Sequence, residues 1–207
     1  MAYSVVIAED YKMVREVFAA TVERSERYRL SGAYATAAEA VAHCRAEAAD
    51  LVLMDVLIPG SVSGLDAARA IKAEHPGTKI IIVTSMPELS FLSRAREIGV
   101  ESFWYKELQE QPLLEVMDRT MAGESVYPSL TPSVAVGNAM SSEFTAREVA
   151  VLRELVSGAS NREIAETLCI AENTVKMHIA NMLQKTGFHS RLELAVKARH
   201  LGVAIKD

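Results

Sequence analysis

The sequence predicts an α/β domain with a doubly wound, five-stranded parallel sheet, followed by a small all-α domain. Short apolar runs alternate with segments of helical spacing over residues 3–123, a pattern typical of a parallel sheet covered on both faces. Residues 128–142 contain no charged side chain, and the formal net charge changes from −6 before this segment to +1 after it. We therefore expect a first domain at 1–125, a linker at 126–142 and a second domain at 143–207.

The elements of the first domain follow from apolar periodicity. The run DLVLM at 50–54 is continuously apolar after its first residue, as in a strand buried on both faces, and KIIIVTS at 79–85 is the strongest strand signal in the chain. In 11–24, five apolar residues from Met13 to Val22 fall on one helical stripe. The expected strands are 3–8, 29–35, 50–54, 79–85 and 101–105, and the expected helices are 11–24, 36–47, 64–75, 88–98 and 112–123.

Composition excludes several classes of protein. The chain has 207 residues, of which 50% are hydrophobic and 24% charged, as in ordinary globular domains. It contains no apolar run of the roughly 20 residues that a membrane helix needs, and its N-terminus lacks the features of a secretory signal. Cys44 and Cys169 lie far apart, so we expect buried thiols in a cytoplasmic protein. The net charge of −5 by itself argues against nucleic-acid binding.

Polar residues mark the carboxyl ends of four predicted strands. Glu9 and Asp10 follow the first strand, Asp55 ends the third, Thr84 lies at the end of the fourth and Lys106 follows the fifth. Ligands of such sheets bind at this edge. If the first and third strands are neighbours, three carboxylates converge and repel one another. A divalent cation removes the conflict, and oxygen ligands favour Mg²⁺. A lysine and a hydroxyl beside them suit the oxygens of a phosphoryl group on an aspartate nucleophile.

This set resembles the receiver domain of bacterial two-component response regulators, which has a flavodoxin-like fold, over about residues 3–123. The resemblance implies that Asp55 accepts a phosphoryl group from a sensor histidine kinase, with Mg²⁺ as cofactor. Thr84 and Lys106 would contact that group, and Phe103 would swing inward together with Thr84. The implied metal ligands are Glu9, largely through water, Asp10, Asp55 and the backbone carbonyl of Leu57.

A phosphatase of the haloacid-dehalogenase type is an alternative, since it also uses an aspartate at a strand end. Such an enzyme requires a second aspartate two residues later, where this chain has Leu57. Without a general acid for turnover, self-phosphorylation fits better than catalysis, and we expect no enzyme activity beyond phosphoryl acceptance and slow release. One spacing departs from the receiver pattern: Gly64 lies nine residues after Asp55 instead of eight.

The tail predicts four helices with capping signals. Thr145 with Glu148 and Ser160 with Glu163 have the spacing of capping boxes. A tight turn leads from the second helix to a third at about 172–185, and a fourth is expected at about 190–201. Two short helices joined by a tight turn are typical of the helix-turn-helix motif, whose second helix enters the major groove.

The tail resembles the LuxR-type effector domain of the NarL/FixJ family. The shared residues are Glu148, Leu152, Gly158, Asn161, Glu163, Ile164, Ala165, Leu168, Thr174, Val175, His178, Ile179, Lys185 and Gly187. By position, Lys176 and Met177 would meet base edges. The phosphate contacts would come from Asn161, Thr174, His178 and Lys185, with Asn173 and Asn181 on the same outward face. His178 fits packing at the helix margin equally well.

Together, the two resemblances imply a transcription regulator that is switched by phosphorylation and binds double-stranded promoter DNA. Phosphorylation would promote a homodimer, for which the fourth helix is the expected seam; the same helix also closes the domain's core. The alternative is a receiver that serves as an interaction module, with DNA binding independent of phosphate.

Overall fold

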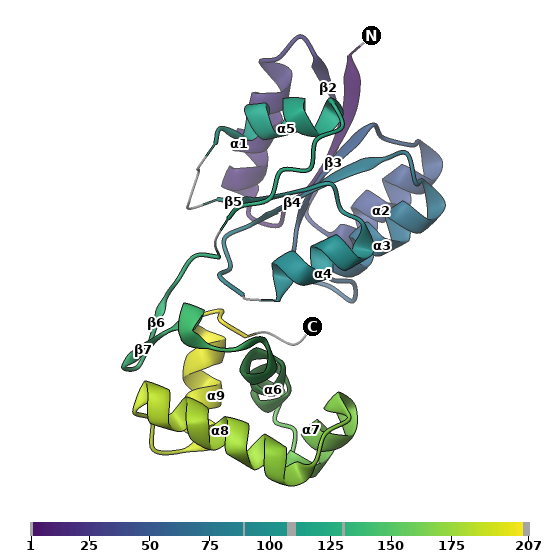
Figure 1. Ribbon diagram of the computed structural model, residues 1–207. Helices are drawn as coiled ribbons and strands as arrows, with labels where there is room; N and C mark the ends of the chain where they lie inside the picture. Colours follow the sequence, from purple (N-terminus) through teal and green to yellow (C-terminus); the bar gives the residue numbers. More distant parts are fainter. Residues whose placement is uncertain (1, 89, 107–110, 130, 205–207) are drawn as a thin grey trace. The chain divides into compact units, whose positions relative to one another are not determined.

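The computed structural model describes residues 2–88, 90–106, 111–129 and 131–204. The chain divides into two units, one formed by residues 1–85 with 92–129 and the other by residues 86–91 with 130–207 (Figure 1). No helix in the described ranges is both long and apolar enough to cross a membrane.

The first unit has the predicted doubly wound sheet. Its strands are β1 (Tyr3–Ala8), β2 (Tyr28–Tyr34), β3 (Leu51–Asp55), β4 (Lys79–Thr84) and β5 (Ser102–Tyr105). Its helices are α1 (Lys12–Glu23), α2 (Ala37–Ala46), α3 (Gly64–Glu74), α4 (Phe91–Ile98) and α5 (Leu113–Met121). All the strands are parallel, in the order β2-β1-β3-β4-β5. The winding of the chain therefore reverses between β1 and β3, and the carboxyl ends of these two strands lie at the topological switch point.

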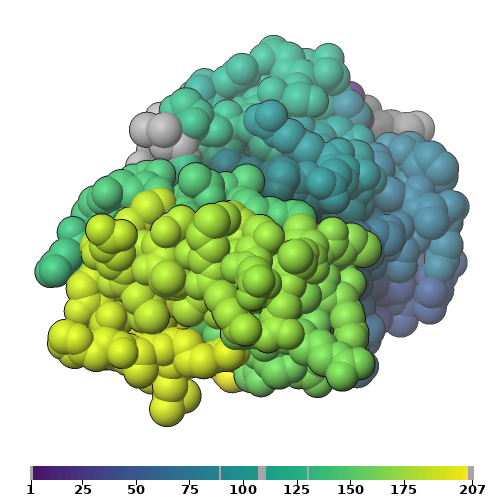
Figure 2. Space-filling model, turned by 60° about the horizontal axis from the view of Figure 1, so that its bottom comes forward, coloured from purple at the N-terminus to yellow at the C-terminus, as the bar shows by residue number. Residues whose placement is uncertain are grey.

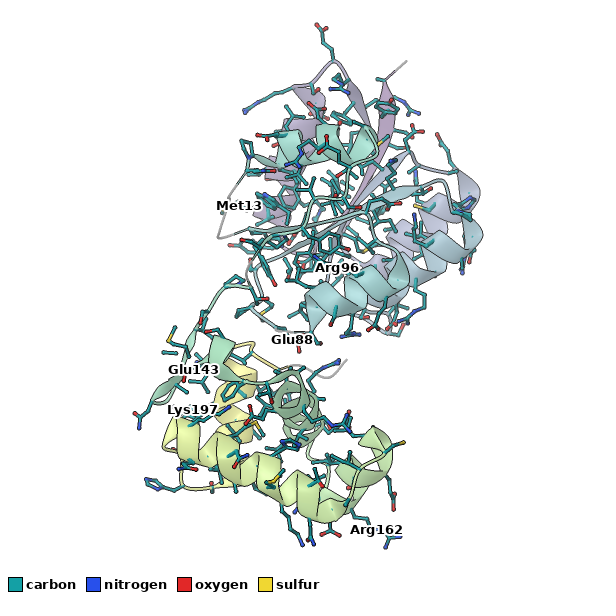
Figure 3. The ribbon with its side chains drawn as sticks, viewed as in Figure 1. Met13, Glu88, Arg96, Glu143, Arg162 and Lys197 are labelled. Carbon is teal, nitrogen blue, oxygen red and sulfur yellow. The ribbon has the colours of Figure 1, made fainter. Side chains whose placement is uncertain are left out.

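Helices cover both faces of the sheet, as Figure 1 shows. Alternate strand residues face α1 and α5, because successive side chains of a strand point to opposite faces. The core on this side consists of Val5, Ile7, Phe18, Val22, Tyr28, Leu51, Leu53, Ile81, Val83, Leu113, Val116 and Met117. On α1 the predicted apolar stripe is wider than the buried face. Met13, labelled in Figure 3, is 64% exposed and Val17 57% exposed, whereas Phe18 and Val22 are buried.

The segment after α5 packs against β5 of the same unit. The carbonyl oxygen of Val126 accepts a hydrogen bond from the Phe103 amide at 2.8 Å. The Tyr127 hydroxyl donates to the Val100 carbonyl at 2.8 Å, and the guanidinium of Arg96 (Figure 3) lies 4.5 Å from the Tyr127 ring centroid. Residues 126 and 127, which we expected to begin the linker, therefore pack on the first unit.

The second unit contains a short hairpin and four helices. Its elements are β6 (Ala135–Val136), β7 (Ala139–Met140), the 3₁₀ helix η1 (Ser141–Glu143), α6 (Ala146–Val156), α7 (Asn161–Leu168), α8 (Glu172–Thr186) and α9 (Arg191–His200). The buried core is Val136, Phe144, Val149, Val151, Leu152, Leu155, Ile164, Ala165, Val175, Ile179, Met182, Leu194, Ala198, Val203 and Ala204. The predicted helical domain is thus present, with the β6–β7 hairpin added to it.

That hairpin lies within the segment 126–142 that we expected to be a linker. Val136 and Ala139 are buried in the second unit, and the Asn138 amide donates to the Thr186 carbonyl at the end of α8, at 2.9 Å. The uncharged segment is therefore more than a connection between the two units, because Val136 and Ala139 belong to the core of the second unit.

The helix starts follow the predicted capping chemistry. Thr145 and Ser160 each accept a hydrogen bond from the amide three residues on, and Glu148 and Glu163 complete both capping boxes. Ala171, at the start of α8, makes no side-chain cap, because a methyl group cannot accept a hydrogen bond. Such a missing cap costs about 1 kcal/mol relative to a serine.

Gly137 tests whether the hairpin stabilises the second unit. Its φ is +64°, and an added Cβ would collide with the Thr186 carbonyl oxygen. Gly158 is the matched control, because its φ of +88° is also left-handed but a Cβ there would meet open space. Both alanine variants should lose about 1–2 kcal/mol to backbone strain. Gly137→Ala should lose about 1–3 kcal/mol more from overpacking.

Amide hydrogen exchange of α6 and α8, measured in the full chain, gives the free energy of unfolding of the second unit in each of the two variants. Equal losses in the two variants would mean that the hairpin does not support α8.

Candidate functional site

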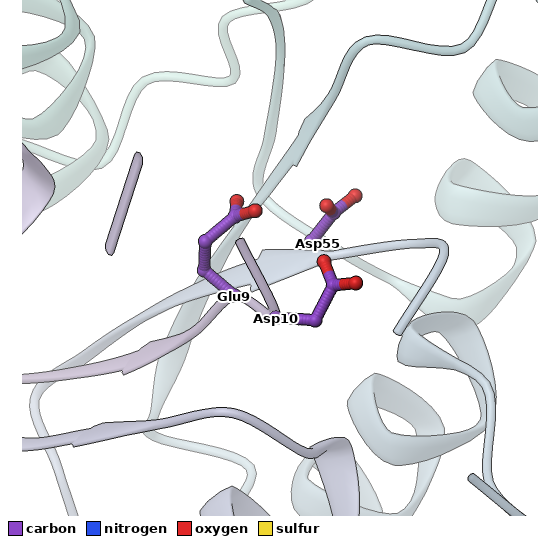
Figure 4. Close-up of side chains that lie close together, drawn as sticks. All are labelled: Glu9, Asp10 and Asp55. Atoms are coloured by element: carbon purple, nitrogen blue, oxygen red, sulfur yellow. The ribbon is translucent and has the colours of Figure 1, made fainter. Parts of the chain in front are cut away.

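The sheet brings three predicted carboxylates to one edge. β1 and β3 are neighbours, with Ala8 opposite Met54, so the residues after β1 lie beside Asp55, the last residue of β3. Glu9, Asp10 and Asp55 each offer an oxygen atom, and these atoms all lie within 4.8 Å of one another (Figure 4). Glu9 and Asp55 are buried and Asp10 is exposed. We refer to these three residues with Lys106 as the acidic pocket.

Lys106, which follows the edge strand β5, reaches this cluster with its side chain. Its amide donates to the Thr84 carbonyl at 3.0 Å, which places it directly after β5. Its Nζ donates to Glu9 Oε2 at 2.6 Å and to Asp55 Oδ2 at 2.8 Å. A buried carboxylate is costly unless it is paired, so this ammonium is what allows two carboxylates to be buried together.

The pocket alters the acidity of its members. Burial raises the pKa of Glu9 above its ordinary value, and the nearby charge of Asp55 adds to the effect, while Lys106 opposes it. Burial by itself would lower the pKa of Lys106, but the charges and hydrogen bonds of Asp55 and Glu9 outweigh burial and raise it. Lys106 therefore remains an ammonium throughout the physiological pH range.

The other predicted pocket residues lie close by. The Leu57 amide donates to Asp55 Oδ1 at 3.3 Å, which orients the carboxylate. Thr84 is fully buried at the end of β4. Phe103 is buried on β5, and its ring centroid lies 4.9 Å from that of Tyr105.

The donor set fits a hard divalent cation. Three carboxylates and one ammonium give these four side chains a formal charge of −2. The available ligand atoms are all oxygens, which Mg²⁺ prefers, and Asp10 is open to solvent, so a bound ion can retain waters.

Gly64 packs closely against the backbone of Asp55 in spite of the unusual loop length. An added Cβ at this position would collide with the backbone carbonyl of Asp55, and the Gly64 amide donates to the Val56 carbonyl at 3.0 Å. The extra residue in the loop therefore leaves this close approach intact, and Gly64 begins α3 directly behind the aspartate.

The second unit has the predicted helix-turn-helix geometry. α7 ends at Leu168, and the next residue, Cys169, adopts a left-handed conformation with φ of 50° before α8 begins at Glu172. Cys169 is exposed, so our expectation of a buried thiol is wrong for this residue and holds for Cys44. Figure 2 shows α8 on the surface of the second unit. Of the predicted DNA contacts on this helix, Asn173, Lys176, Met177 and Asn181 are exposed, whereas Thr174, His178 and Lys185 are half-buried.

Lys185 is part of the packing of the second unit. Its Nζ donates to Glu148 Oε2 at 2.7 Å and to the Glu143 carbonyl at 2.9 Å. Glu148 is buried and also caps α6. The lysine thus ties the end of α8 to the start of α6, in addition to the phosphate contact that we predicted for it.

Two further contacts of charged side chains in the second unit were missed from the sequence. Arg191 Nη1 donates to Asn161 Oδ1 at 2.8 Å, which holds the Asn161 amide at the start of α7. On α8, Lys176 forms an ion pair with Glu172 at 3.1 Å. The i,i+4 spacing indicates the second pair, but no local pattern indicates the first.

Two protein families match the chain. Residues 5–118 match the family described as "Response regulator receiver domain". Residues 142–198 match "Bacterial regulatory proteins, luxR family". Both matches agree with the resemblances inferred from the sequence.

Several curated proteins are similar over nearly their full length. The response regulator protein VraR of Staphylococcus aureus is 30% identical, over 96% of this chain and 97% of its own. The nitrate/nitrite response regulator protein homolog of Haemophilus influenzae is 28% identical, over 93% and 94%.

Among solved structures, RcsB from Salmonella enterica serovar Typhimurium, bound to a promoter in the presence of phosphomimetic BeF3, has a TM-score of 0.63 at 19% identity, over 95% of this chain and 98% of its own. A LuxR-family response regulator from Aurantimonas has a TM-score of 0.57 at 26% identity, over 64% and 91%.

The Glu148–Lys185 pair predicts a pH dependence of stability. Burial alone would raise the pKa of Glu148, but hydrogen bonds from Lys185 and Thr145 outweigh it and lower the pKa below 4.5. A lowered pKa stabilises the fold above the unfolded-state value, and this contribution is lost as the pH falls through the folded-state value. Glu148→Gln should therefore lose about 2 kcal/mol at pH 7 and progressively less below pH 4.5.

Urea denaturation followed by circular dichroism at several pH values measures the difference from wild type. Glu166→Gln is the control, since Glu166 forms a surface pair with Arg162 in the same unit. A loss for Glu148→Gln that stays constant with pH would contradict the interpretation.

Proposed function

The chain belongs to the bacterial response regulators in which a receiver domain precedes a LuxR-type DNA-binding domain, and on that premise we propose that phosphorylation of Asp55 by a sensor histidine kinase controls its binding to promoter DNA. The observation that carries the proposal is the acidic pocket. Asp55 is buried, one of its oxygens is bound by Lys106, and two further carboxylates stand beside it.

The chemistry is a transfer between two nucleophiles. An oxygen of the Asp55 carboxylate attacks the phosphorus of a phosphohistidine, the P–N bond breaks, and the leaving imidazole takes a proton from solvent. Mg²⁺, when bound, supplies positive charge to the transferring phosphoryl oxygens. Asp10, Asp55 and the Leu57 carbonyl would hold it directly, with Glu9 acting largely through water.

The remaining pocket residues stabilise the product. Lys106 already lies at 2.8 Å from Asp55, so its ammonium can donate to a phosphoryl oxygen with little movement. The Thr84 hydroxyl, at the end of the adjacent strand, would bind another oxygen. Its turn toward the phosphate would be accompanied by a rearrangement of Phe103, which spreads the change to β5.

The output is DNA binding as a dimer. α8 would enter the major groove, with Lys176 and Met177 at base edges and Asn161, Thr174, His178 and Lys185 at phosphates; Asn173 and Asn181 flank them. The formal charge of +1 over residues 143–207 favours weak binding by one copy, because phosphate neutralisation supplies much of the affinity. Leu192 and Val196 on α9 are 70% and 57% exposed, which supports a dimer seam on that helix.

The names of the similar proteins support the proposal of a response regulator that binds DNA. Relatives similar over almost the whole chain are named response regulators, and RcsB was solved on a promoter with a phosphomimetic. We propose the cytoplasm as the site of action, where a DNA-binding regulator meets its promoter.

Phosphoryl acceptance is the first prediction. Incubated with Mg²⁺ and a small phosphodonor such as phosphoramidate, the full chain should gain one phosphoryl group by intact-mass spectrometry. Asp55→Asn should gain none, because the amide is not a nucleophile. Asp50→Asn is the control: Asp50 binds Ser4 near the start of β1 and should leave labelling intact. Equal labelling of Asp55→Asn and wild type would disprove the assignment.

Phosphorylation should strengthen DNA binding. In gel-shift titrations against sequences selected from a random pool, the phosphodonor should tighten binding by wild type, because two copies double the phosphate contacts. It should have no effect on Asp55→Ala. Identical affinities for both proteins, with and without phosphodonor, would instead favour DNA binding that is independent of phosphate.

A further inference from the structure

Arg15 contacts the backbone from which two of the pocket carboxylates project. It lies in the first turn of α1, and its Nη1 donates to the carbonyl oxygen of Glu9 at 2.6 Å and to that of Asp10 at 3.1 Å. The guanidinium therefore binds two successive peptide groups between β1 and α1.

These two peptide groups lie just beyond the end of β1, where the hydrogen bonds of the sheet no longer fix the backbone. The Glu9 amide still donates to the Tyr34 carbonyl of β2 at 3.0 Å, but β1 ends at Ala8. Beyond that point the direction of each side chain depends on how its peptide planes are held. Here the Glu9 side chain points inward to Lys106, and Asp10 stays at the solvent edge.

The position of Arg15 has a local cost. Basic residues in the first turn oppose the helix dipole; α1 has no acidic residue in that turn, and Tyr11 provides no side-chain cap. Within the described ranges Arg15 forms no ion pair with a carboxylate, so its charge does not occupy the oxygens that a cation would need. Its hydrogen bonds go to backbone carbonyls instead, which leaves the carboxylates available.

We propose that Arg15 is a positioning residue of the acidic pocket: by holding the Glu9 and Asp10 carbonyls it directs the two carboxylates toward Asp55, and Mg²⁺ binding depends on it. This inference rests on the proposed function, since it assigns Arg15 a role in the metal site of phosphoryl acceptance.

The sign of the effect separates positioning from simple electrostatics. Arg15 carries a positive charge close to a cation site, so removal of that charge alone would favour Mg²⁺. Loss of positioning would disfavour it, because the ligand oxygens would no longer be preorganised. Residues that orient metal ligands typically contribute about tenfold or more to metal affinity.

Isothermal titration of Mg²⁺ into the full chain tests the proposal. Arg15→Met keeps the length of the side chain but removes both hydrogen bonds, and should weaken Mg²⁺ binding about tenfold. Arg15→Lys keeps the charge and one donor group, and should give an intermediate affinity. Lys12→Met is the matched control. Lys12 is also in the first turn of α1, but its side chain is 80% exposed and pairs with Glu16 on the surface, so its loss should leave affinity unchanged or slightly higher.

A second readout separates positioning from a general loss of structure. Labelling by phosphoramidate should slow in Arg15→Met at low Mg²⁺ and recover as Mg²⁺ is raised, whereas unfolding detected by circular dichroism would reduce labelling at any Mg²⁺ concentration. If Arg15→Met does not fold, Arg15→Lys decides: weaker Mg²⁺ binding supports the proposal and wild-type affinity overturns it.

Two other results would overturn the inference: Arg15→Met binding Mg²⁺ as tightly as wild type or more tightly, or Lys12→Met weakening binding equally. Failure of the proposed function has a different signature, since wild type itself would then neither bind Mg²⁺ nor accept a phosphoryl group.

Discussion

The ammonium of Lys106 lies between two buried carboxylates, and the chemistry of the first unit depends on that arrangement. Its Nζ is 2.6 Å from Glu9 and 2.8 Å from Asp55. Two carboxylates at this edge would repel each other without a cation between them. In the function that we propose, the same ammonium would also bind an oxygen of the phosphoryl group on Asp55. The contact that stabilises the two carboxylates would then have to be shared with that group.

The second unit uses a lysine–glutamate pair for a different purpose. Lys185 binds Glu148 at 2.7 Å, and the hydrogen bonds of that carboxylate outweigh its burial, so its pKa falls. In the acidic pocket, burial dominates and the pKa of Glu9 rises. The Glu148–Lys185 pair balances its own charges and fixes α8 on α6. The acidic pocket has excess negative charge, which is the condition under which a cation binds.

The strand-end rule carried most of the site prediction. Because parallel strands end at the same edge, Glu9, Asp10, Asp55 and Lys106 could be expected together once the strands were identified. Two arginines could not be: Arg15 reaches back to two carbonyls, and Arg191 crosses to Asn161. The first contact depends on the path of the backbone between β1 and α1, and the second on how the starts of α7 and α9 pack together; periodicity describes neither.

The sequence by itself determined the order of helices and strands and the two capping boxes, because periodicity and capping act over a few neighbouring positions. It also supplied the candidate residues for metal and DNA binding. Only the tertiary structure decided which residues meet. Glu9 and Lys106 are 97 positions apart, and their contact requires the strand order β1-β3-β4-β5. Packing also assigned Val136 to a core, left Met13 in solvent and tied Lys185 to Glu148, because burial is a property of the assembled fold and not of a segment.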